Sequence, residues 1–188
     1  MNEIKIKNFD EIKASNLIDN PSIHIYRDCL GKSVRLKTYD GRLKEVQSVN
    51  IGDRLLAYGN KVVTVSNIFT GRNETIYHLR CDGCETSMSG NHPILSENGK
   101  EIAVNKLKVG DKIMAENGAT VKALSVDKEP YDDIVYNLVF EGERESVYIL
   151  VDGIYAGDIN AQNNMRETKE ENERMLRQIG EMYKEFLI

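Results

Sequence analysis

The chain has 188 residues, 40% of them hydrophobic, and a formal net charge of −5 at pH 7, which suits one packed domain with modest extensions. The negative charge, the absence of Trp and the lack of a basic cluster interleaved with aromatic residues argue against a nucleic-acid partner. No apolar run is long enough for a signal peptide or a membrane span, so we expect a cytoplasmic protein with no membrane partner. The sequence leaves a bacterial and a phage source open.

Residues 1–28 differ in pattern from the region that follows them. Their apolar residues keep neither a helical nor a strand period throughout, and Asn20-Pro21 interrupts the run. Residues 22–26 then alternate between polar and apolar side chains, which predicts a short extended stretch. We therefore interpret residues 1–28 as an N-terminal leader to a domain that begins at Cys29.

From Cys29 to about Ala156 the pattern is typical of an all-β protein. Short runs rich in Val, Ile, Leu, Thr and Tyr are separated by turn pairs, in which Gly supplies the positive φ of a tight hairpin. The turn signals are Asp40-Gly41, Gly59-Asn60, Asp82-Gly83, Asn98-Gly99, Glu116-Asn117-Gly118 and Asp152-Gly153. This spacing predicts many short strands joined by hairpins.

One stretch of the β region occurs twice. Residues 40–55 superimpose on residues 98–113 without a gap, at an offset of 58 positions (98 − 40 = 58). After one inserted residue the match continues between residues 76–79 and residues 135–138. Self-similarity of this length predicts two copies of one supersecondary unit, and because one copy cannot close its own core, the copies should pack about a pseudo-twofold axis.

After an Asn-rich link the C-terminal composition becomes that of a helix. Apolar residues recur at helical spacing between charged ones, which predicts an amphipathic helix from about Met165 to Phe186. We treat residues 160–188 as a C-terminal helical extension that follows the domain at 29–159. The apolar stripe of this helix either packs on the β domain or serves self-association or docking to a partner, and the sequence leaves both open.

Cys29 stands at the junction between the leader and the β region. Attack of its thiol on the carbonyl of Asp28, the residue before it, would move the acyl group from nitrogen to sulfur and form a thioester. Nucleophile and target are adjacent in the chain, so proximity is built in. An ordinary cysteine thiol, with a pKa of about 8.5, still needs activation at neutral pH. The alternative interpretation is a buried, inert cysteine.

A second set of candidates lies in the segment Ser89-Gly90-Asn91-His92-Pro93, directly after a predicted strand. An imidazole, whose ordinary pKa is about 6.5, can protonate the amide nitrogen that leaves when a thioester forms. The hydroxyl of Ser89 and nearby backbone N–H groups can orient that amide and stabilise the oxyanion. The alternative interpretation is an ordinary loop.

Together these residues resemble the Hint domain, the self-processing module shared by inteins, bacterial intein-like domains and hedgehog proteins. The matching motifs, in family order, are Cys29, Asp40-Gly41, Gly52-Asp53, Ser89-Gly90-Asn91-His92 and Val135-Tyr136-Asn137-Leu138. The family has Thr where this chain has Ser89, a change that keeps the hydroxyl. The resemblance covers about Cys29 to Asp158, and it implies a pseudo-twofold horseshoe of β-hairpins.

The resemblance also implies roles for the candidate residues. Cys29 would attack the Asp28 carbonyl, His92 would protonate the leaving nitrogen, and Ser89 would hold the amide and the oxyanion. The substrate would be the flanking peptide of the chain itself, with neither a cofactor nor a metal. The activity implied is single-turnover, cysteine-dependent autoproteolysis.

The C-terminal end departs from the pattern of splicing members of the family. Those members end in His-Asn followed by Cys, Ser or Thr, and the Asn side chain cyclises to cut the second junction. Here Gly157 and Asp158 take those places, and a carboxylate is a poorer cyclising nucleophile than a carboxamide. We therefore expect cleavage at Asp28–Cys29 without complete splicing, and we keep Asp158 as a candidate site residue. Asn137 stands where many members carry an Asp that assists the first step, which would slow that step.

The segment Cys81-Asp82-Gly83-Cys84 has the spacing of some zinc and redox sites. The two cysteines flank a turn and no second such pair occurs, so we expect cross-strand neighbours, with a disulfide only in an oxidising setting. Cys29 and His92 would complete a zinc site only if they converged on this pair. Three cysteines are too few for a disulfide framework, so a reducing compartment is the default. We expect His24 and His78 to be structural.

Three hypotheses emerge from the sequence. The first is a Hint module that cleaves its own chain. The second is a Hint fold that has lost catalysis and acts as a structural or interaction module, as the Gly157-Asp158 ending and the C-terminal helix suggest. The third is a small zinc-binding protein built around the Cys81 and Cys84 pair.

Overall fold

Left-handed turns close the predicted hairpins in the structure, a computed structural model that describes residues 29–142 and 145–165. Gly41 and Gly99, in the predicted turn pairs Asp40-Gly41 and Asn98-Gly99, have φ angles of 85° and 74°, a region that glycine enters without steric cost. Their N–H groups donate to Thr38 O and Ser96 O, each over 2.9 Å. The same turn therefore forms in both copies of the repeat.

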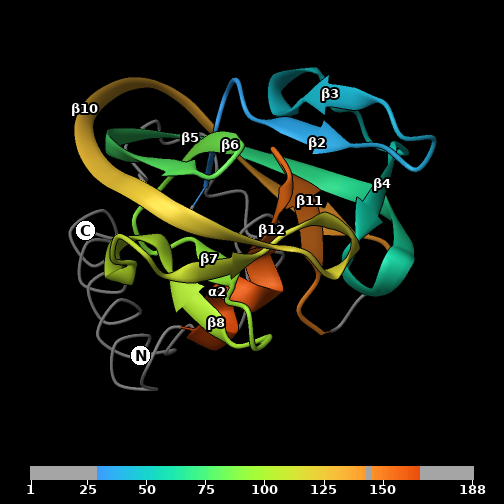
Figure 1. The fold of residues 1–188 in the computed structure, drawn as a ribbon. Coiled ribbons are helices and arrows are strands. Elements are labelled where there is room, and N and C mark those ends of the chain that lie inside the picture. Colours follow the sequence, from blue (N-terminus) through green and yellow to red (C-terminus); the bar gives the residue numbers. More distant parts are fainter. Residues whose placement is uncertain (1–28, 143–144, 166–188) are drawn as a thin grey trace, which may run out of the picture. The chain divides into compact units, whose positions relative to one another are not determined.

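The described residues form twelve strands, four short 3-10 turns and one α-helix (Figure 1). The strands are β1 (Leu30–Gly31), β2 (Arg35–Lys37), β3 (Leu43–Glu45), β4 (Arg54–Ala57), β5 (Lys61–Cys81), β6 (Cys84–Met88), β7 (Pro93–Leu95), β8 (Glu101–Ala103), β9 (Lys112–Met114), β10 (Thr120–Phe140), β11 (Tyr148–Val151) and β12 (Ile154–Gly157). The helical elements are η2 (Val46–Ser48), η3 (Tyr58–Asn60), η4 (Val104–Lys106), η5 (Glu116–Gly118) and α2 (Ile159–Met165). The all-β prediction is confirmed.

Two long strands hold the sheet together. β5 and β10, of 21 residues each, pair with one another in antiparallel register over most of their length. β5 also pairs with β4 and β6, while β10 also pairs with β1 and β9. The order along the sheet is β8-β7-β12-β11-β4-β5-β6-β1-β10-β9, with β2 joined to β3 and β11. The long pair thereby connects the two copies of the repeat.

The predicted pseudo-twofold arrangement is confirmed element by element. At the offset of 58, β2 falls on β7, β3 on β8, η2 on η4 and η3 on η5. The turn hydrogen bonds repeat as well: Thr38 N donates to Arg42 O over 2.8 Å, and Ser96 N donates to Lys100 O over 2.9 Å. Local sequence thus specifies one hairpin unit, which the chain builds twice.

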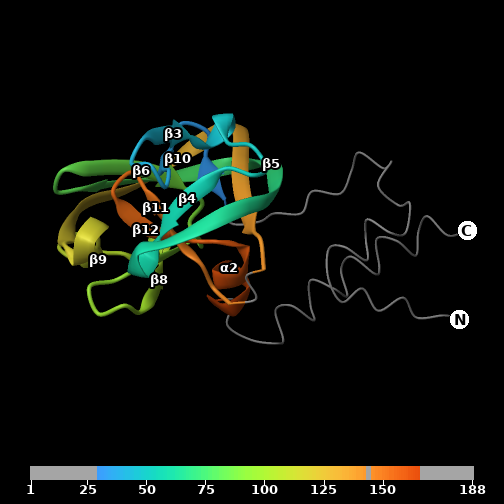
Figure 2. The same cartoon turned by 90° about the vertical axis from the view of Figure 1, so that its right-hand side faces the viewer.

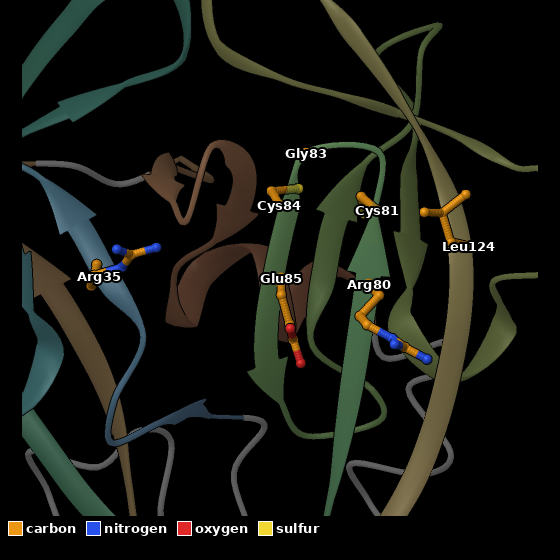
Figure 3. Close-up of a pocket in the computed structure, with 7 residues that line it drawn as sticks. All are labelled: Arg35, Arg80, Cys81, Gly83, Cys84, Glu85 and Leu124. Atoms are coloured by element: carbon orange, nitrogen blue, oxygen red, sulfur yellow. The ribbon is translucent and has the colours of Figure 1, made fainter.

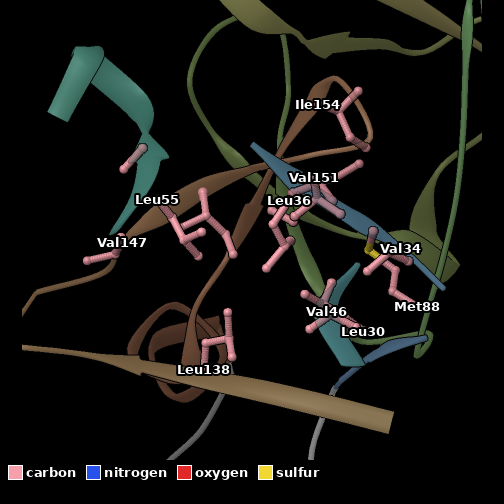
Figure 4. Close-up of a cluster of buried hydrophobic side chains, with 14 of the residues drawn as sticks. Leu30, Val34, Leu36, Val46, Leu55, Met88, Leu138, Val147, Val151 and Ile154 are labelled. Carbon is pink, nitrogen blue, oxygen red and sulfur yellow. The ribbon is translucent and has the colours of Figure 1, made fainter. Parts of the chain in front are cut away.

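The hydrophobic core is made of matched residues from both copies. Leu36 and Leu55 of the first copy are fully buried (Figure 4). Ile94 and Ile113, which lie at the same offset in the second copy, are also fully buried. The matched core pairs are Leu30 and Met88, Leu36 and Ile94, Val46 and Val104, Val49 and Leu107, Leu55 and Ile113, and Val65 and Ala123. Full burial of such a side chain stabilises the fold by about 1.5–3 kcal/mol, so neither copy is complete without the other.

The helix α2 follows the last strand and packs against β7, β10 and β12 (Figure 2). All described residues belong to one compact unit. The predicted leader at 1–28 and nearly all of the predicted helix from Met165 to Phe186 lie outside the described residues. Within the part of the chain that the structure describes, no helix is long and apolar enough to cross a membrane.

Candidate functional site

Cys29 is positioned by the strand that follows it. β1 lies between β6 and β10, where Leu30 pairs with Met88 on one side and Tyr136 on the other. This insertion leaves Cys29 only 4% exposed. The thiol predicted to be the nucleophile therefore sits inside the β unit, away from bulk water.

Ser89 holds the backbone of Cys29 through two hydrogen bonds. The N–H of Cys29 donates to Ser89 Oγ over 2.6 Å, and the N–H of Ser89 donates to Cys29 O over 2.8 Å. Cys29 N is the nitrogen of the predicted scissile bond, so the hydroxyl contacts the atom that would leave. Asp28, on the other side of that bond, lies outside the described residues.

His92 ends the turn that Ser89 begins. Its N–H donates to Ser89 O over 3.0 Å, and its side chain is 1% exposed. The ring Nδ1 lies 3.5 Å from Nε2 of Gln162, which projects from α2. The side-chain amide nitrogen of Gln162 is a donor, so Nδ1 is the acceptor in this contact. Ser89 therefore contacts the backbone of both Cys29 and His92.

Gln162 also joins Asn137 of β10 to the site. Asn137 Nδ2 donates to Gln162 Oε1 over 2.8 Å, and Gln162 Nε2 lies 3.3 Å from Asn137 Oδ1. Both side chains are buried, and buried amides are stable when they satisfy one another in this way. The pair of amides supports the His92 ring from the side of α2.

Sequence reasoning missed Gln162 because it lies in a stretch that was interpreted as a polar link. The available signal was its spacing from Asp158. An Asp before a helix is a good N-cap, and the residue four positions later lies on the adjoining turn of the helix. The structure has this arrangement, with Gln162 N donating to Asp158 O over 3.1 Å.

The Asp158 side chain caps the helix α2. Its Oδ1 accepts hydrogen bonds from Val147 N over 3.1 Å and from Ala161 N over 2.9 Å. Burial raises the pKa of this carboxyl above its usual value, while the backbone N–H groups that it accepts lower it. Asp158 therefore contacts backbone donors at the start of α2, and the structure gives it a structural role there.

Gly157 is enclosed by its neighbours. A Cβ atom at this position would lie 2.5 Å from Ala161 Cβ, 2.8 Å from Pro93 Cγ and 3.2 Å from Tyr148 Cε1. No larger side chain fits unless α2 shifts. The helix thus accounts for the absence of an imidazole at the position where the resemblance places one.

Cys81 and Cys84 lie at the far end of the hairpin β5–β6 from Ser89. They are directly opposite one another across the turn, which confirms the predicted cross-strand pair. Among residues 29–142 and 145–165, no group of three or more His, Cys, Asp and Glu side chains is arranged to hold a metal ion. The structure does not bring Cys29 and His92 to this pair, so the zinc hypothesis has no support from it.

The chain is similar in structure to several inteins. No protein-family model and no curated protein matches it. Over 71% of this chain and 99% of the other, it superimposes on the bacterial intein-like domain from Clostridium thermocellum with a TM-score of 0.61 and 18% identity. The gp41-1 intein matches 70% of this chain and 98% of its own with a TM-score of 0.59 and 19% identity.

A DnaB intein from Synechocystis gives a similar result. It matches over 70% of this chain and 99% of its own, with a TM-score of 0.60 and 12% identity. At these identities the likeness concerns the fold, and it agrees with the duplicated hairpins and the matched core described above. The chain therefore has the Hint fold of inteins and intein-like domains.

Proposed function

We propose that this chain is a Hint-type self-processing domain that releases its leader at the Asp28–Cys29 bond. The observation that carries the proposal is the 2.6 Å hydrogen bond from Cys29 N to Ser89 Oγ. It fixes the nitrogen of the bond to be cut within a buried site that also holds His92. Holding reacting groups in a fixed geometry lowers the barrier by several kcal/mol.

In the first step the Cys29 thiol passes its proton to His92, and its sulfur bonds to the carbonyl carbon of Asp28. The carbon–nitrogen bond then breaks, and Cys29 N must gain a proton to leave as an amine. We assign this proton to His92, which lies in the same turn as Ser89. Ser89 keeps the nitrogen in place during the transfer. The product is a thioester between the leader and Cys29.

Release of the leader requires a second nucleophile. Water attacks the thioester carbon, the sulfur of Cys29 leaves and regains a proton, and the leader departs with a new carboxylate on Asp28. An added thiol can replace water by exchange. Each molecule reacts once, on its own chain, without a cofactor. We place this chemistry in the cytoplasm, where a reducing environment keeps Cys29 as a thiol.

We do not extend the proposal to complete splicing. The carboxylate of Asp158 accepts two backbone hydrogen bonds at the start of α2, which tie it to the backbone there. Gly157 provides no acid or base, and its surroundings leave no room for one. Asp158 is therefore assigned to the support of α2 and Gln162.

The proposal is tested by the intact mass of the purified full chain, followed over time with and without an added thiol. We expect loss of residues 1–28, faster with thiol, and no loss in Cys29→Ala. Cys84→Ala is the matched control for removing a cysteine and should cleave normally. Ser89→Ala should slow cleavage about ten- to a hundredfold, since the hydroxyl contacts the leaving nitrogen. Folded protein that stays full-length with thiol, or cleavage in Cys29→Ala at the normal rate, would refute the proposal.

A second candidate function is a structural or interaction module without catalysis. It is favoured by the closure of the site by α2, whose Gln162 binds both His92 and Asn137. Light scattering of the full chain and of a chain that ends at Met165 tests self-association through the C-terminal extension. A dimer of the full chain that becomes a monomer on truncation, together with an intact leader, would support this function over self-cleavage.

A further inference from the structure

The turn between β5 and β6 carries a pair of thiols that the proposed processing reaction does not use. Cys81 and Cys84 are opposite one another in the register of the hairpin, and both are reduced. Residues that face each other across antiparallel strands have Cα atoms about 4.5–5.5 Å apart, within the range that a disulfide spans. The expected Cα separation is therefore one that a disulfide can span.

Neighbouring strands hold this turn in place. Asp82 N donates to Lys122 O over 3.0 Å, and Cys81 pairs with Ala123 of β10. On the other side, the Cβ of Cys84 lies 3.8 Å from the position that a Cβ on Gly153 would take, in the turn between β11 and β12. The two thiols are thus fixed from both sides, which favours their reaction with each other over reaction with distant thiols.

The two thiols differ in environment. Cys81 is 5% exposed, whereas Cys84 is partly accessible to solvent. The Cys81 thiol donates a hydrogen bond to the Cys84 sulfur, which lowers the pKa of Cys84 and raises the pKa of Cys81. Attack on an outside disulfide requires an accessible thiolate. Cys84 is therefore suited to attack, and Cys81 to complete the reaction.

A solvent-facing pocket of about 550 Å³ opens beside the pair. Figure 3 shows Cys81 and Cys84 on adjacent strands below Gly83, with Arg35 on one side and Leu124 on the other. Ala123 pairs with Cys81 and Ser125 with Arg80, so Leu124 is the extra residue of a bulge and half of it is exposed. The bulge provides an apolar wall next to the thiols.

One of the two arginines of the pocket has no carboxylate partner among the described residues. Arg35, Arg80 and Glu85 are its charged residues. Arg35 Nε is paired with Asp152 over 3.0 Å. Arg80 Nε donates to the neutral hydroxyl of Ser125 over 3.2 Å, and Arg80 forms no ion pair with Glu85, which lies opposite it in the hairpin. A small disulfide with carboxylates can meet Arg80 while its sulfurs reach Cys84.

We propose that Cys81 and Cys84 form a thiol–disulfide exchange site for small anionic disulfides such as glutathione disulfide. The Cys84 thiolate attacks one sulfur of the glutathione disulfide, forms a mixed disulfide and releases one glutathione. Cys81 then loses its proton and attacks the Cys84 sulfur, which releases the second glutathione. The two cysteines are oxidised to one disulfide, and the glutathione disulfide is reduced to two thiols.

The test uses the full chain with Cys29→Ala, so that the result does not depend on the proposed processing reaction. The folded protein is incubated with glutathione disulfide, quenched by alkylation and digested with trypsin. Cleavage after Arg80 and Lys100 places both cysteines in one peptide. We expect this peptide to lose two hydrogen atoms and to carry no glutathione. If both cysteines remain alkylated while the protein is folded, the proposal is wrong.

Single cysteine variants in the same background separate the two roles. Cys81→Ser should accumulate a mixed disulfide on Cys84, because the second thiol is missing. Cys84→Ser should form a mixed disulfide on Cys81 at least about tenfold more slowly, since Cys81 is buried. Equal rates in the two variants would overturn the assigned order of attack.

The charge of the ligand is tested with Arg80→Gln in the same background. We expect oxidation by glutathione disulfide to slow roughly tenfold, while oxidation by the uncharged hydroxyethyl disulfide keeps its rate. An unchanged rate with glutathione disulfide would show that the pocket does not select anionic disulfides.

Discussion

Two turns of this molecule share a backbone hydrogen bond and differ in the side chain that they bury. Residues 31–34 precede the first copy of the repeat, and residues 89–92 precede the second at the same offset of 58. Val34 N donates to Gly31 O over 3.2 Å, and His92 N donates to Ser89 O over 3.0 Å. The side chain at the last position is 2% exposed in the first turn and 1% in the second. One turn thus buries a valine and the other an imidazole in the same place.

The difference between these two turns shows how one copy of a duplicated fold can carry reactive side chains on the same backbone turn. The repeat provides a rigid, buried turn, and the change from Gly31 to Ser89 adds the hydroxyl that binds Cys29 N. A buried imidazole costs stability unless it has a hydrogen-bonding partner, and α2 provides one through Gln162. The scaffold comes from duplication, whereas the chemistry depends on two side chains and a helix after the second copy.

The largest expected effect comes from making the second turn like the first. His92→Val should reduce cleavage of the leader by roughly 10²–10⁴-fold, because it removes the proton donor. The fold should survive, since Val34 occupies the equivalent position in the first copy. Intact mass over time gives the cleavage rate, and circular dichroism checks the fold. A folded variant that cleaves at the normal rate would contradict the role assigned to His92.

The matched core positions predict that truncating a core side chain in either copy of the repeat lowers the free energy of unfolding by the same amount. Leu36→Ala and Ile94→Ala should each lower the free energy of unfolding by about 2–5 kcal/mol, since both side chains are fully buried at matched positions. Urea unfolding in the Cys29→Ala background measures both without cleavage. Values that differ by more than about 2 kcal/mol would show that one copy dominates the core.

A smaller loss is expected where the second turn depends on α2. Gln162→Ala should lower the free energy of unfolding by about 1–3 kcal/mol, because Asn137 and His92 lose a buried partner. Gln47→Ala is the matched control: this Gln is exposed and bonds Glu45, so its loss should cost less than about 0.5 kcal/mol. Equal losses in urea unfolding would mean that Gln162 does not support the site.

The smallest effect concerns the turn pairs that open the two copies, Asp40-Gly41 and Asn98-Gly99. Hydrogen bonds from Arg42 and Thr38 lower the pKa of Asp40 from 3.8 to about 2. This carboxylate therefore contributes stability above pH 3.8 that is lost as the pH falls toward 2. Asp40→Asn, which copies Asn98, should flatten the stability profile in that window. Urea midpoints from pH 5 to pH 2 measure it, and an unchanged slope would contradict the assignment.

Much of the fold was predictable because its signals are local. The turn pairs at Asp40-Gly41 and Asn98-Gly99 form the predicted hairpins, since Gly relieves the strain of a positive φ wherever it occurs. The offset between copies also predicted the matched core. Cys29, Ser89 and His92 were identified from their order and chemistry, and the structure places Ser89 in contact with the backbone of both others.

The remaining features depend on contacts between distant segments. Gln162 reaches His92 across 70 positions of sequence, and its role depends on the helix that Asp158 caps. The sequence offered Asp158 as a candidate site residue and placed residue 162 in a link. The helix cap and the contact with His92 could not be predicted, because they depend on burial and side-chain direction.

By itself the sequence determined the two β copies and their turns, and it predicted Cys29, Ser89 and His92 as the residues of the proposed cleavage site. Only the tertiary structure decided that α2 closes the site, that Gly157 has no room for a side chain and that Cys81 and Cys84 face a pocket. Turn and strand preferences act over a few residues, whereas burial and hydrogen-bond partners arise when the sheet brings distant strands together.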